Sequence, residues 1–314
     1  MTEPGTALLD GAGPVSAARR LLALPSGLVR TARPRQWVKN LLVVAAPAAA
    51  GRLTSPHVIA QLSMVFVLFT GAASAVYLIN DARDAEADRA HPDKCHRPVA
   101  AGRVPAAVAY AVGGVLAVLA PLAAALACNA MTATLLTAYV VMQLAYCVKL
   151  KHVLVVDLVV VTTGFLMRAM TGGVALGIPL SRWFLITAGF GALFMVSAKR
   201  YSEALQMEGS GAATRSLLNA YTTGYLRFVW QLAAGVAVLA YCMWALESGG
   251  VSNGSLLPWR QLSMVPFIGA ILRYAVFADR GSAGAPEDVV LRDRALAVIG
   301  LAWITMYALA VADL

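Results

Sequence analysis

Residues 80–98 read NDARDAEADRAHPDKCHRP and directly follow a long apolar run, so a dense group of charges begins where a membrane segment ends. Asn80, Asp84 and Asp88 recur every four residues and share one face of a helix, with Asp81 at its border. Carboxylates that converge on one point repel one another unless a cation lies between them. Oxygen ligands suit Mg²⁺. The spacing therefore predicts a magnesium site formed by these four residues.

Basic side chains in the same stretch favour an anion beside that metal. Mg²⁺ usually shares its remaining coordination positions with water and with the phosphates of a substrate. We therefore expect substrate contacts from the amide and the cations of this stretch: Asn80, Arg83, Lys94 and Arg97. The alternative is a solvated charged loop, which is the usual environment of a run of charges.

The composition predicts an all-α integral membrane protein. Of 314 residues, 60% are hydrophobic and only 13% are charged, which is not the balance of a soluble domain. Most of the apolar segments approach the roughly 20 residues that span a bilayer. The first is short and is interrupted by Pro47. We expect about nine transmembrane helices, near residues 37–50, 55–79, 105–127, 130–148, 153–177, 181–198, 221–246, 261–278 and 295–312.

The distribution of charge predicts the orientation. With the N-terminus in the cytoplasm, the inner segments carry nineteen Lys and Arg residues, whereas the outer segments carry only Arg52, Arg182 and Arg260. This strong positive-inside bias places the N-terminus and the 80–103 loop in the cytoplasm. The net charge of +9 is thus accounted for by topology and anion binding, and nucleic acid is not an expected partner. We expect a flexible cytoplasmic tail over residues 1–32 and one membrane domain over residues 33–314.

A weaker pattern indicates an internal duplication. The second apolar segment ends in NDARDAEAD, and the sixth, four segments later, ends in SAKRYSEALQ. Both are polar runs at the same end of a helix. This is the arrangement expected of two pseudo-repeated four-helix halves plus one further helix, with the site between the halves.

Four motifs together resemble the UbiA superfamily of intramembrane prenyltransferases. They are RPRQWVKN (33–40), the aspartate motif, KLKHVLVVD (149–157) and SAKRYSE (197–203). The chain is most similar to the branch that transfers phosphoribose from 5-phosphoribosyl diphosphate (PRPP) to decaprenyl phosphate for cell-wall arabinan. The resemblance implies a Mg²⁺-dependent catalytic domain over residues 33–314. It also implies a location in the plasma (inner) membrane and favours a homo-oligomer, with a trimer expected.

The end of the sixth segment departs from the wider superfamily. Aromatic prenyltransferases carry a second aspartate-rich motif there, whereas this chain has Lys199, Arg200, Tyr201 and Glu203. Cations at this place imply direct contact with phosphate, since Lys and Arg neutralise it without a metal. We therefore expect these four residues to bind substrate. The alternative is an ordinary i,i+4 pair between Lys199 and Glu203 at a helix end.

Further candidates lie between the motifs. Lys39 follows Trp37 at the start of the first segment, and Tyr146, Lys149 and Lys151 lie at the junction of the fourth and fifth segments. We expect all four candidates to contact substrate. An interfacial anchor for Lys39 and a topology signal for the two other lysines are the alternatives.

Asp157 is a predicted catalytic residue together with Asp84 and Asp88. It lies in the apolar run VLVVDLVVV, where a charge requires a partner. Lys149, Lys151 or a substrate group could supply that partner. Arg168 lies about 16 Å along the helix, too far for a direct pair. A buried structural ion pair is the alternative for each of them.

The expected reaction is the transfer of phosphoribose from PRPP to decaprenyl phosphate, with release of pyrophosphate. The first alternative is a prenyltransferase that moves a prenyl group from its diphosphate to an aromatic acceptor, and the SAKRYSE segment argues against it. The second alternative is a transporter that uses Asp157 as its coupling site. A transporter does not need carboxylates at helical spacing at one helix end.

Overall fold

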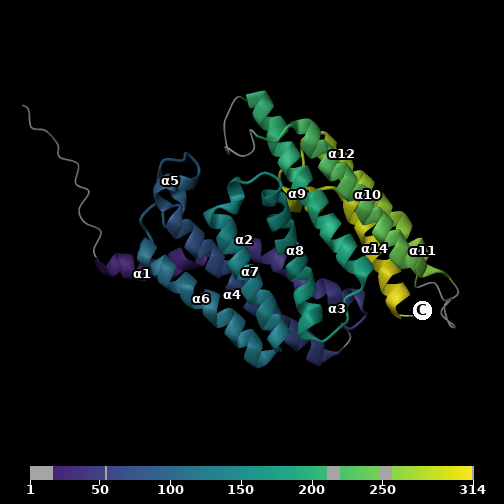
Figure 1. Cartoon of the computed structure of the whole chain (residues 1–314), viewed down its shortest axis with the longest axis horizontal. Helices are drawn as coiled ribbons and strands as arrows, with labels where there is room; N and C mark the ends of the chain where they lie inside the picture. The colour runs from purple at the N-terminus through teal and green to yellow at the C-terminus, as the bar shows by residue number, and fades with distance from the viewer. Residues whose placement is uncertain (1–16, 54, 211–219, 248–256, 313–314) are drawn as a thin grey trace, which may run out of the picture.

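The computed structural model describes residues 17–53, 55–210, 220–247 and 257–312, and within these ranges all regular secondary structure is helical (Figure 1). The long helices are α1 (Ala17–Thr31), α4 (Pro56–Arg83), α6 (Ala106–Ala127), α7 (Ala130–Val148), α8 (Val156–Ala175), α9 (Arg182–Ser210), α10 (Thr223–Glu247), α12 (Met264–Asp279) and α14 (Arg294–Ala312). Shorter elements are α2 (Pro34–Trp37), η1 (Val38–Val44), α3 (Ala45–Ala49), α5 (Ala85–Arg89), η2 (Lys94–His96), η3 (Leu150–His152), α11 (Trp259–Leu262) and α13 (Pro286–Arg292).

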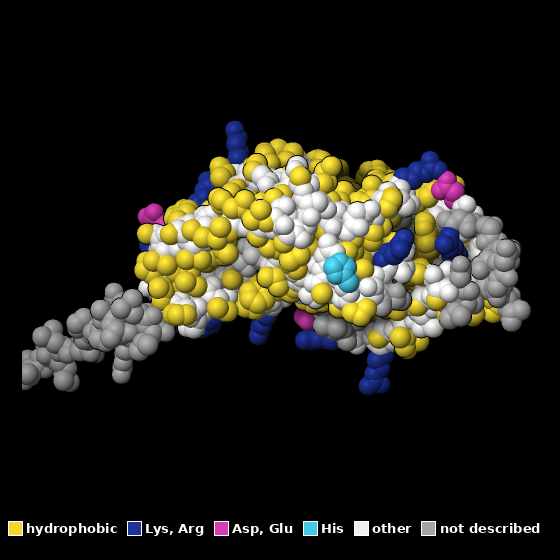
Figure 2. Space-filling view, turned by 90° about the horizontal axis from the view of Figure 1, so that it is seen from below, with side chains coloured by type: hydrophobic (Ala, Val, Ile, Leu, Met, Phe, Trp, Pro, Cys, Tyr) yellow, Lys and Arg dark blue, Asp and Glu magenta, His cyan; other side chains and the backbone are white. Residues whose placement is uncertain are grey.

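The chain is an integral membrane protein by the length and composition of its helices. Seven described helical segments are long and apolar enough to cross a membrane: α4, α6, α7, α8, α10, α11 with α12, and α14. The expected count of nine is not confirmed. The sixth predicted segment forms the 29-residue helix α9, which is not among the seven. Figure 2 shows the face opposite the aspartate motif, where hydrophobic side chains predominate.

The first predicted segment is not a continuous spanning helix. It consists of η1 followed by α3, because Pro47 has no N–H to continue a helical hydrogen-bond ladder. A Cβ added to Gly172 on α8 would lie 1.9 Å from the Val43 carbonyl oxygen, and one added to Gly173 would lie 2.9 Å from Ala46 Cβ. These two glycines thus let the backbone of the first segment pack directly on α8, as small residues do between membrane helices.

Two of the three clusters of buried apolar side chains among the described residues correspond to the two halves of the chain, and the third lies around Leu78 and Val104. One gathers buried side chains of η1, α4, α6, α7 and α8, including Phe69 and Leu136. The other gathers side chains of α9, α10, α12 and α14 together with Leu158 of α8, and includes Phe194 and Trp230. Helices α8 and α9 pack together where the halves meet, as Figure 1 shows. The first segment also contacts the last helix, since Tyr307 Oη donates to the Ala49 carbonyl oxygen over 2.9 Å.

The predicted N-terminal tail contains a helix over part of its length. Residues 1–16 lie outside the described residues, whereas Ala17–Thr31 forms α1. A Cβ at Gly27 would lie 2.6 Å from Val104 Cγ2, so α1 packs closely on the segment that follows the aspartate motif. We call this end of the bundle, which carries residues 80–98, the motif end.

Candidate active site

The aspartate motif keeps its helical register across a short break. Asp84 ends α4 and begins α5 with φ −86° and ψ 2°. Its backbone N–H still donates to the Asn80 carbonyl oxygen over 2.9 Å, and the N–H of Asp88 donates to the Asp84 carbonyl oxygen over 2.8 Å. The predicted i,i+4 spacing of Asn80, Asp84 and Asp88 is therefore present in the structure, at the end of a helix that crosses the membrane.

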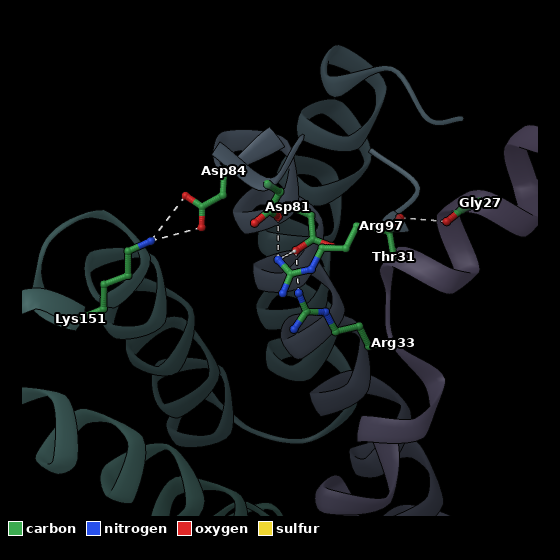
Figure 3. A network of polar contacts seen from close by, with 8 residues as sticks. Gly27, Thr31, Arg33, Asp81, Asp84, Arg97 and Lys151 are labelled. Carbon is green, nitrogen blue, oxygen red and sulfur yellow. Dashed lines mark hydrogen bonds and ion pairs between the residues drawn. The ribbon is translucent and has the colours of Figure 1, made fainter. Parts of the chain in front are cut away.

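Two arginines hold Asp81 and Asp88 in place (Figure 3). Arg33 Nη2 lies 2.6 Å from Asp81 Oδ1, and Arg97 Nη1 bridges the two carboxylates at 3.2 Å from Asp81 and 2.7 Å from Asp88. The Asp81 side chain is only 2% exposed. Arg33 was not predicted as a site residue, because it lies among basic residues that also signal topology. Its left-handed backbone (φ 57°) and its position over the Tyr77 ring show that it is fixed there.

Lys151 joins the aspartate motif from a different part of the chain. Its Nζ lies 3.2 Å from Asp84 Oδ2 and 3.5 Å from Asp84 Oδ1, and Figure 3 shows the side chain reaching Asp84 from the turn before α8. Both side chains are about a quarter exposed. The structure thus brings together two residues that were predicted separately, one as a metal ligand and the other as a substrate contact.

A second group of charges lies where α8 meets α9. Asp157 is 3% exposed and accepts hydrogen bonds from Tyr146 Oη at 2.5 Å and from Arg200 Nε at 3.3 Å. Arg200 also donates to Glu203 over 3.1 Å. The cation at Asp157 is Arg200, and Lys151 pairs with Asp84 instead. The structure therefore shows the buried ion pair that was given as the alternative for Asp157, and its contact with a substrate group stays a prediction. A buried carboxylate needs a close cation, and the one that meets it lies 43 residues away in sequence.

Lys199 and Tyr201 flank this group in different environments. The Lys199 ammonium lies 3.9 Å from Glu203, and its side chain is 40% exposed. This is the i,i+4 pair anticipated as the alternative, but it lies within α9 and not at a helix end, because α9 continues to Ser210. Tyr201 is 1% exposed, packs near Trp230 and accepts a hydrogen bond from Arg227. Its substrate contact stays a prediction, because so little of its side chain is accessible.

Arg168 is fixed by neutral partners. Its guanidinium donates to Asn40 Oδ1 over 2.9 Å, to Tyr139 Oη over 2.7 Å and to the Gly164 carbonyl oxygen over 2.8 Å. It also lies over the Phe69 ring. No carboxylate pairs with it within the described residues, so the anticipated buried ion pair is wrong for Arg168. Its hydrogen bonds instead tie the first segment to α7 and α8.

Three of the four remaining predicted substrate contacts lie near the motif end. Arg83 is exposed and donates to the Val148 carbonyl oxygen over 3.2 Å. Lys149 is exposed at the end of α7, and Lys94 is partly exposed in η2. Lys39 lies in η1, next to the buried Asn40. The neighbours of Asn40 are Thr70 and Arg168, which belong to neither charged group. The contacts of all four residues with substrate remain predictions.

The turn between Lys151 and Asp157 has an unusual backbone. Val155 has φ 68° and ψ −46°, a region that β-branched residues rarely adopt. Its N–H donates to the Tyr221 hydroxyl over 2.7 Å. Burial raises the pKa of Tyr221 above its ordinary value. Sequence reasoning did not find Tyr221, since nothing in the sequence indicates which residue lies beside the turn.

The side chains of the motif suit Mg²⁺ only as a shared ion. Asn80, Asp84 and Asp88 offer the amide and carboxylate oxygens that this ion prefers, but Asp88 is paired with Arg97 and Asp84 with Lys151, and Asp81 is engaged by two arginines. Among the described residues, no three His, Cys, Asp or Glu side chains are grouped closely enough to hold an ion. The donor set therefore fits an ion whose other positions are filled by water and by phosphate oxygens of a substrate.

Fold and site together define a class of protein: an all-helical membrane protein with acidic and basic side chains gathered at one end of its bundle. Residues 41–299 match the UbiA prenyltransferase family, and the chain belongs to that family. The decaprenyl-phosphate phosphoribosyltransferase of Mycobacterium tuberculosis H37Rv is 52% identical over 293 residues, covering 92% of this chain and 95% of that protein. The protein of the same name from Corynebacterium glutamicum is 47% identical, covering 92% of this chain and 87% of that protein.

Solved structures share the fold at low sequence identity. A UbiA homologue from Archaeoglobus fulgidus bound to DMAPP and Mg²⁺ gives a TM-score of 0.67 at 15% identity, covering 92% of this chain and 100% of that one. A digeranylgeranylglyceryl phosphate synthase gives a TM-score of 0.64 at 15% identity, covering 94% of this chain and 100% of that one. At this identity the likeness establishes the UbiA fold of the chain.

Proposed function

We propose that this chain transfers the 5-phosphoribosyl group of PRPP to decaprenyl phosphate and releases pyrophosphate. The names of the relatives that are 47–52% identical over most of the chain support this proposal. The observation that carries it is the basic lining of the site. Lys151 lies beside Asp84, and Lys199 lies on α9 next to Arg200, the partner of Asp157, where they suit a reaction between two phosphorylated substrates.

In this proposal the aspartate motif binds the diphosphate of PRPP. Asp84 and Asp88, with Asn80, would hold Mg²⁺ once a substrate draws Arg97 and Lys151 away from these carboxylates. The ion would supply positive charge for the departing pyrophosphate. Asp81 supports this arrangement indirectly, because it holds Arg33 and Arg97 beside the motif. Lys151 then needs only a small movement from Asp84 to contact a phosphate oxygen.

The chemical step requires no nucleophile from the protein. The bond from the ribose anomeric carbon to the pyrophosphate oxygen breaks, and that carbon gains oxocarbenium character. An oxygen of decaprenyl phosphate then forms the new bond from the opposite face. Lys199, whose ammonium is accessible, orients the lipid phosphate. Asp157 holds Arg200, the residue after Lys199 on α9, in position. Catalysis consists of positioning and electrostatic stabilisation.

The proposed location is the plasma membrane, with the motif end in the cytoplasm. PRPP is water-soluble, so its site has to open to the cytosol, while the decaprenyl chain enters from the bilayer. The excess of Lys and Arg at the motif end supports this orientation. A homo-oligomer, with a trimer as the proposed state, is tested by native mass spectrometry of the protein released from detergent.

One assay tests the proposed function. Purified protein is incubated with Mg²⁺, PRPP and decaprenyl phosphate, and the lipid fraction is analysed by mass spectrometry. We expect a decaprenyl phosphate that has gained one phosphoribosyl group, and we expect a chelator to abolish the product until Mg²⁺ is added in excess. In parallel, the protein receives a prenyl diphosphate and an aromatic acid. Product only in this second reaction would replace the proposal with the aromatic prenyltransferase alternative.

A further inference from the structure

The turn before α8 combines a strained backbone with a position between two functional groups. Val156 N–H donates to the Leu154 carbonyl oxygen over 2.8 Å, which closes a three-residue γ-turn centred on Val155. The form of this turn with positive φ is rare and strained. Among the described residues other than glycine, only Arg33 and Val155 have positive φ.

This turn sets the relative positions of Lys151 and Asp157. Lys151 precedes it and contacts Asp84 on the aspartate motif. Asp157 follows it and contacts Arg200 on α9. A relaxed Val155 with negative φ would redirect the chain between them. At least one of the two contacts would then be lost, because the partner of Lys151 lies at the end of α4 and the partner of Asp157 lies on α9.

Tyr221 is the group that holds the turn. Its hydroxyl accepts the Val155 N–H over 2.7 Å, and its side chain is 8% exposed within the core of the second half. Its ring stacks on Tyr225 with centroids 5.8 Å apart and planes 8° from parallel. The hydroxyl is thus a fixed acceptor that comes from a part of the chain 66 residues further on.

We propose that Tyr221 is a positioning residue for phosphoribosyl transfer, because its hydroxyl holds the strained Val155 turn and thereby places Lys151 opposite Asp84 and Asp157 opposite Arg200. This inference rests on the proposed function for the reaction that it assists. It assigns to Tyr221 no contact with substrate. Its action is through the backbone of the turn alone.

The test is a double-mutant cycle in the full-length protein. Tyr221→Phe removes the acceptor and keeps the stacked ring, and Val155→Gly relieves the strain, since glycine adopts positive φ readily. We expect Tyr221→Phe to raise the KM for PRPP by about tenfold, the effect of one lost buried hydrogen bond. In the Val155→Gly background the same substitution should raise that KM by about twofold or less. Tyr225→Phe is the matched control and should keep the wild-type KM.

Three outcomes would overturn the inference. An unchanged KM in Tyr221→Phe shows that the hydroxyl does not position the site. An equal rise of the KM for PRPP in the wild-type and Val155→Gly backgrounds shows that the Tyr221 hydroxyl does not act through the turn. If Tyr221→Phe lowers kcat only in proportion to the fraction of folded protein and leaves the KM unchanged, the hydroxyl contributes to stability alone.

Hydrogen–deuterium exchange separates this inference from the proposed function. A peptide that covers residues 150–158 should exchange faster in Tyr221→Phe than in the wild type, and Tyr225→Phe should leave its exchange unchanged. If the wild type transfers no phosphoribose, the proposed function fails, and the exchange result still decides whether Tyr221 holds the turn. Unchanged exchange in an active Tyr221→Phe protein would overturn the inference and leave the proposed function intact.

Discussion

Lys151 Nζ lies 3.2 Å from Asp84 Oδ2, and this contact joins the turn before α8 to the end of α4. Both side chains are about a quarter exposed. A pair with this exposure contributes only about 0–1 kcal/mol to stability. Stability therefore does not explain why a lysine lies against the aspartate motif. We propose that Lys151 binds the charges of a substrate, because the same cation can move from carboxylate to phosphate at little cost.

The carboxylate of Asp84 is the first group to test. Asp84→Asn keeps the shape of the side chain and removes the charge that we assign to Mg²⁺ binding. We expect turnover to fall by about 100-fold or more, since a metal contributes several kcal/mol to transition-state stabilisation. The thermal unfolding midpoint should change little. The measurement is product formation as a function of Mg²⁺ concentration, with Glu86→Gln on the exposed side of α5 as the control. Near-normal activity of Asp84→Asn at ordinary Mg²⁺ concentrations would remove Asp84 from the metal site.

Gly172 tests the packing of the first segment on α8. A methyl group there would lie 1.9 Å from the Val43 carbonyl oxygen, so Gly172→Ala forces the backbone of η1 away from α8. We expect a loss of about 1–3 kcal/mol or more, seen as a lower unfolding midpoint in detergent. Gly191→Ala is the matched control in α9, where no atom lies within 4 Å of the added methyl group. It should be neutral or stabilising by up to about 1 kcal/mol. Equal midpoints in the two variants would contradict the close backbone contact.

The local part of the site could be predicted from the sequence. Helical spacing placed Asn80, Asp84 and Asp88 on one face and Asp81 at its border, because that relation depends only on the helix itself. The structure keeps this register, and Asp81 turns to Arg33 and Arg97 instead.

The partners of the charges could not be predicted, because they depend on which helix ends lie side by side. Asp157 required a cation, and the nearest lysines in sequence were the obvious candidates. The actual partner, Arg200, comes from the other half of the bundle. The buried charge of Arg168 required hydrogen-bond acceptors, and these are a carbonyl oxygen, an amide oxygen and a phenol oxygen in place of a carboxylate. Hydropathy also could not reveal that the first apolar segment is divided between η1 and α3.

Residues at the two ends of α4 test the orientation of the protein in the membrane. His57 near its start and Glu86 just beyond its end are both exposed, and a helix of this length separates them by about 40 Å. In a variant without the native cysteines, His57→Cys should react with an impermeant thiol reagent in intact cells. Glu86→Cys should react only after the cells are opened. The reverse labelling would place the motif end outside the cytoplasm, where PRPP is not available.

Lys199 and Arg200 are adjacent in sequence, and the structure predicts opposite consequences for them. The Lys199 side chain is 40% exposed, and its i,i+4 pair with Glu203 within α9 contributes about 0.2–0.5 kcal/mol. Lys199→Gln should therefore leave the unfolding midpoint almost unchanged. If its ammonium binds a phosphate, the lost contact of about 1.5–3 kcal/mol should raise the KM for a phosphorylated substrate by about 10-fold to 100-fold.

Arg200 should act mainly through stability, because its side chain is 9% exposed and neutralises the buried Asp157. Arg200→Gln leaves that carboxylate without a cation, and breaking a buried pair in this way costs about 3–5 kcal/mol. The double variant Asp157→Asn/Arg200→Gln should regain part of the lost midpoint, since no charge is then left unpaired. Arg280→Gln, which removes an exposed cation at the end of α12, is the control for charge alone.

The same control decides the role of Lys199. If Lys199→Gln matches Arg280→Gln in both KM and unfolding midpoint, Lys199 serves only topology, and the lipid phosphate must be bound by other cations of the motif end.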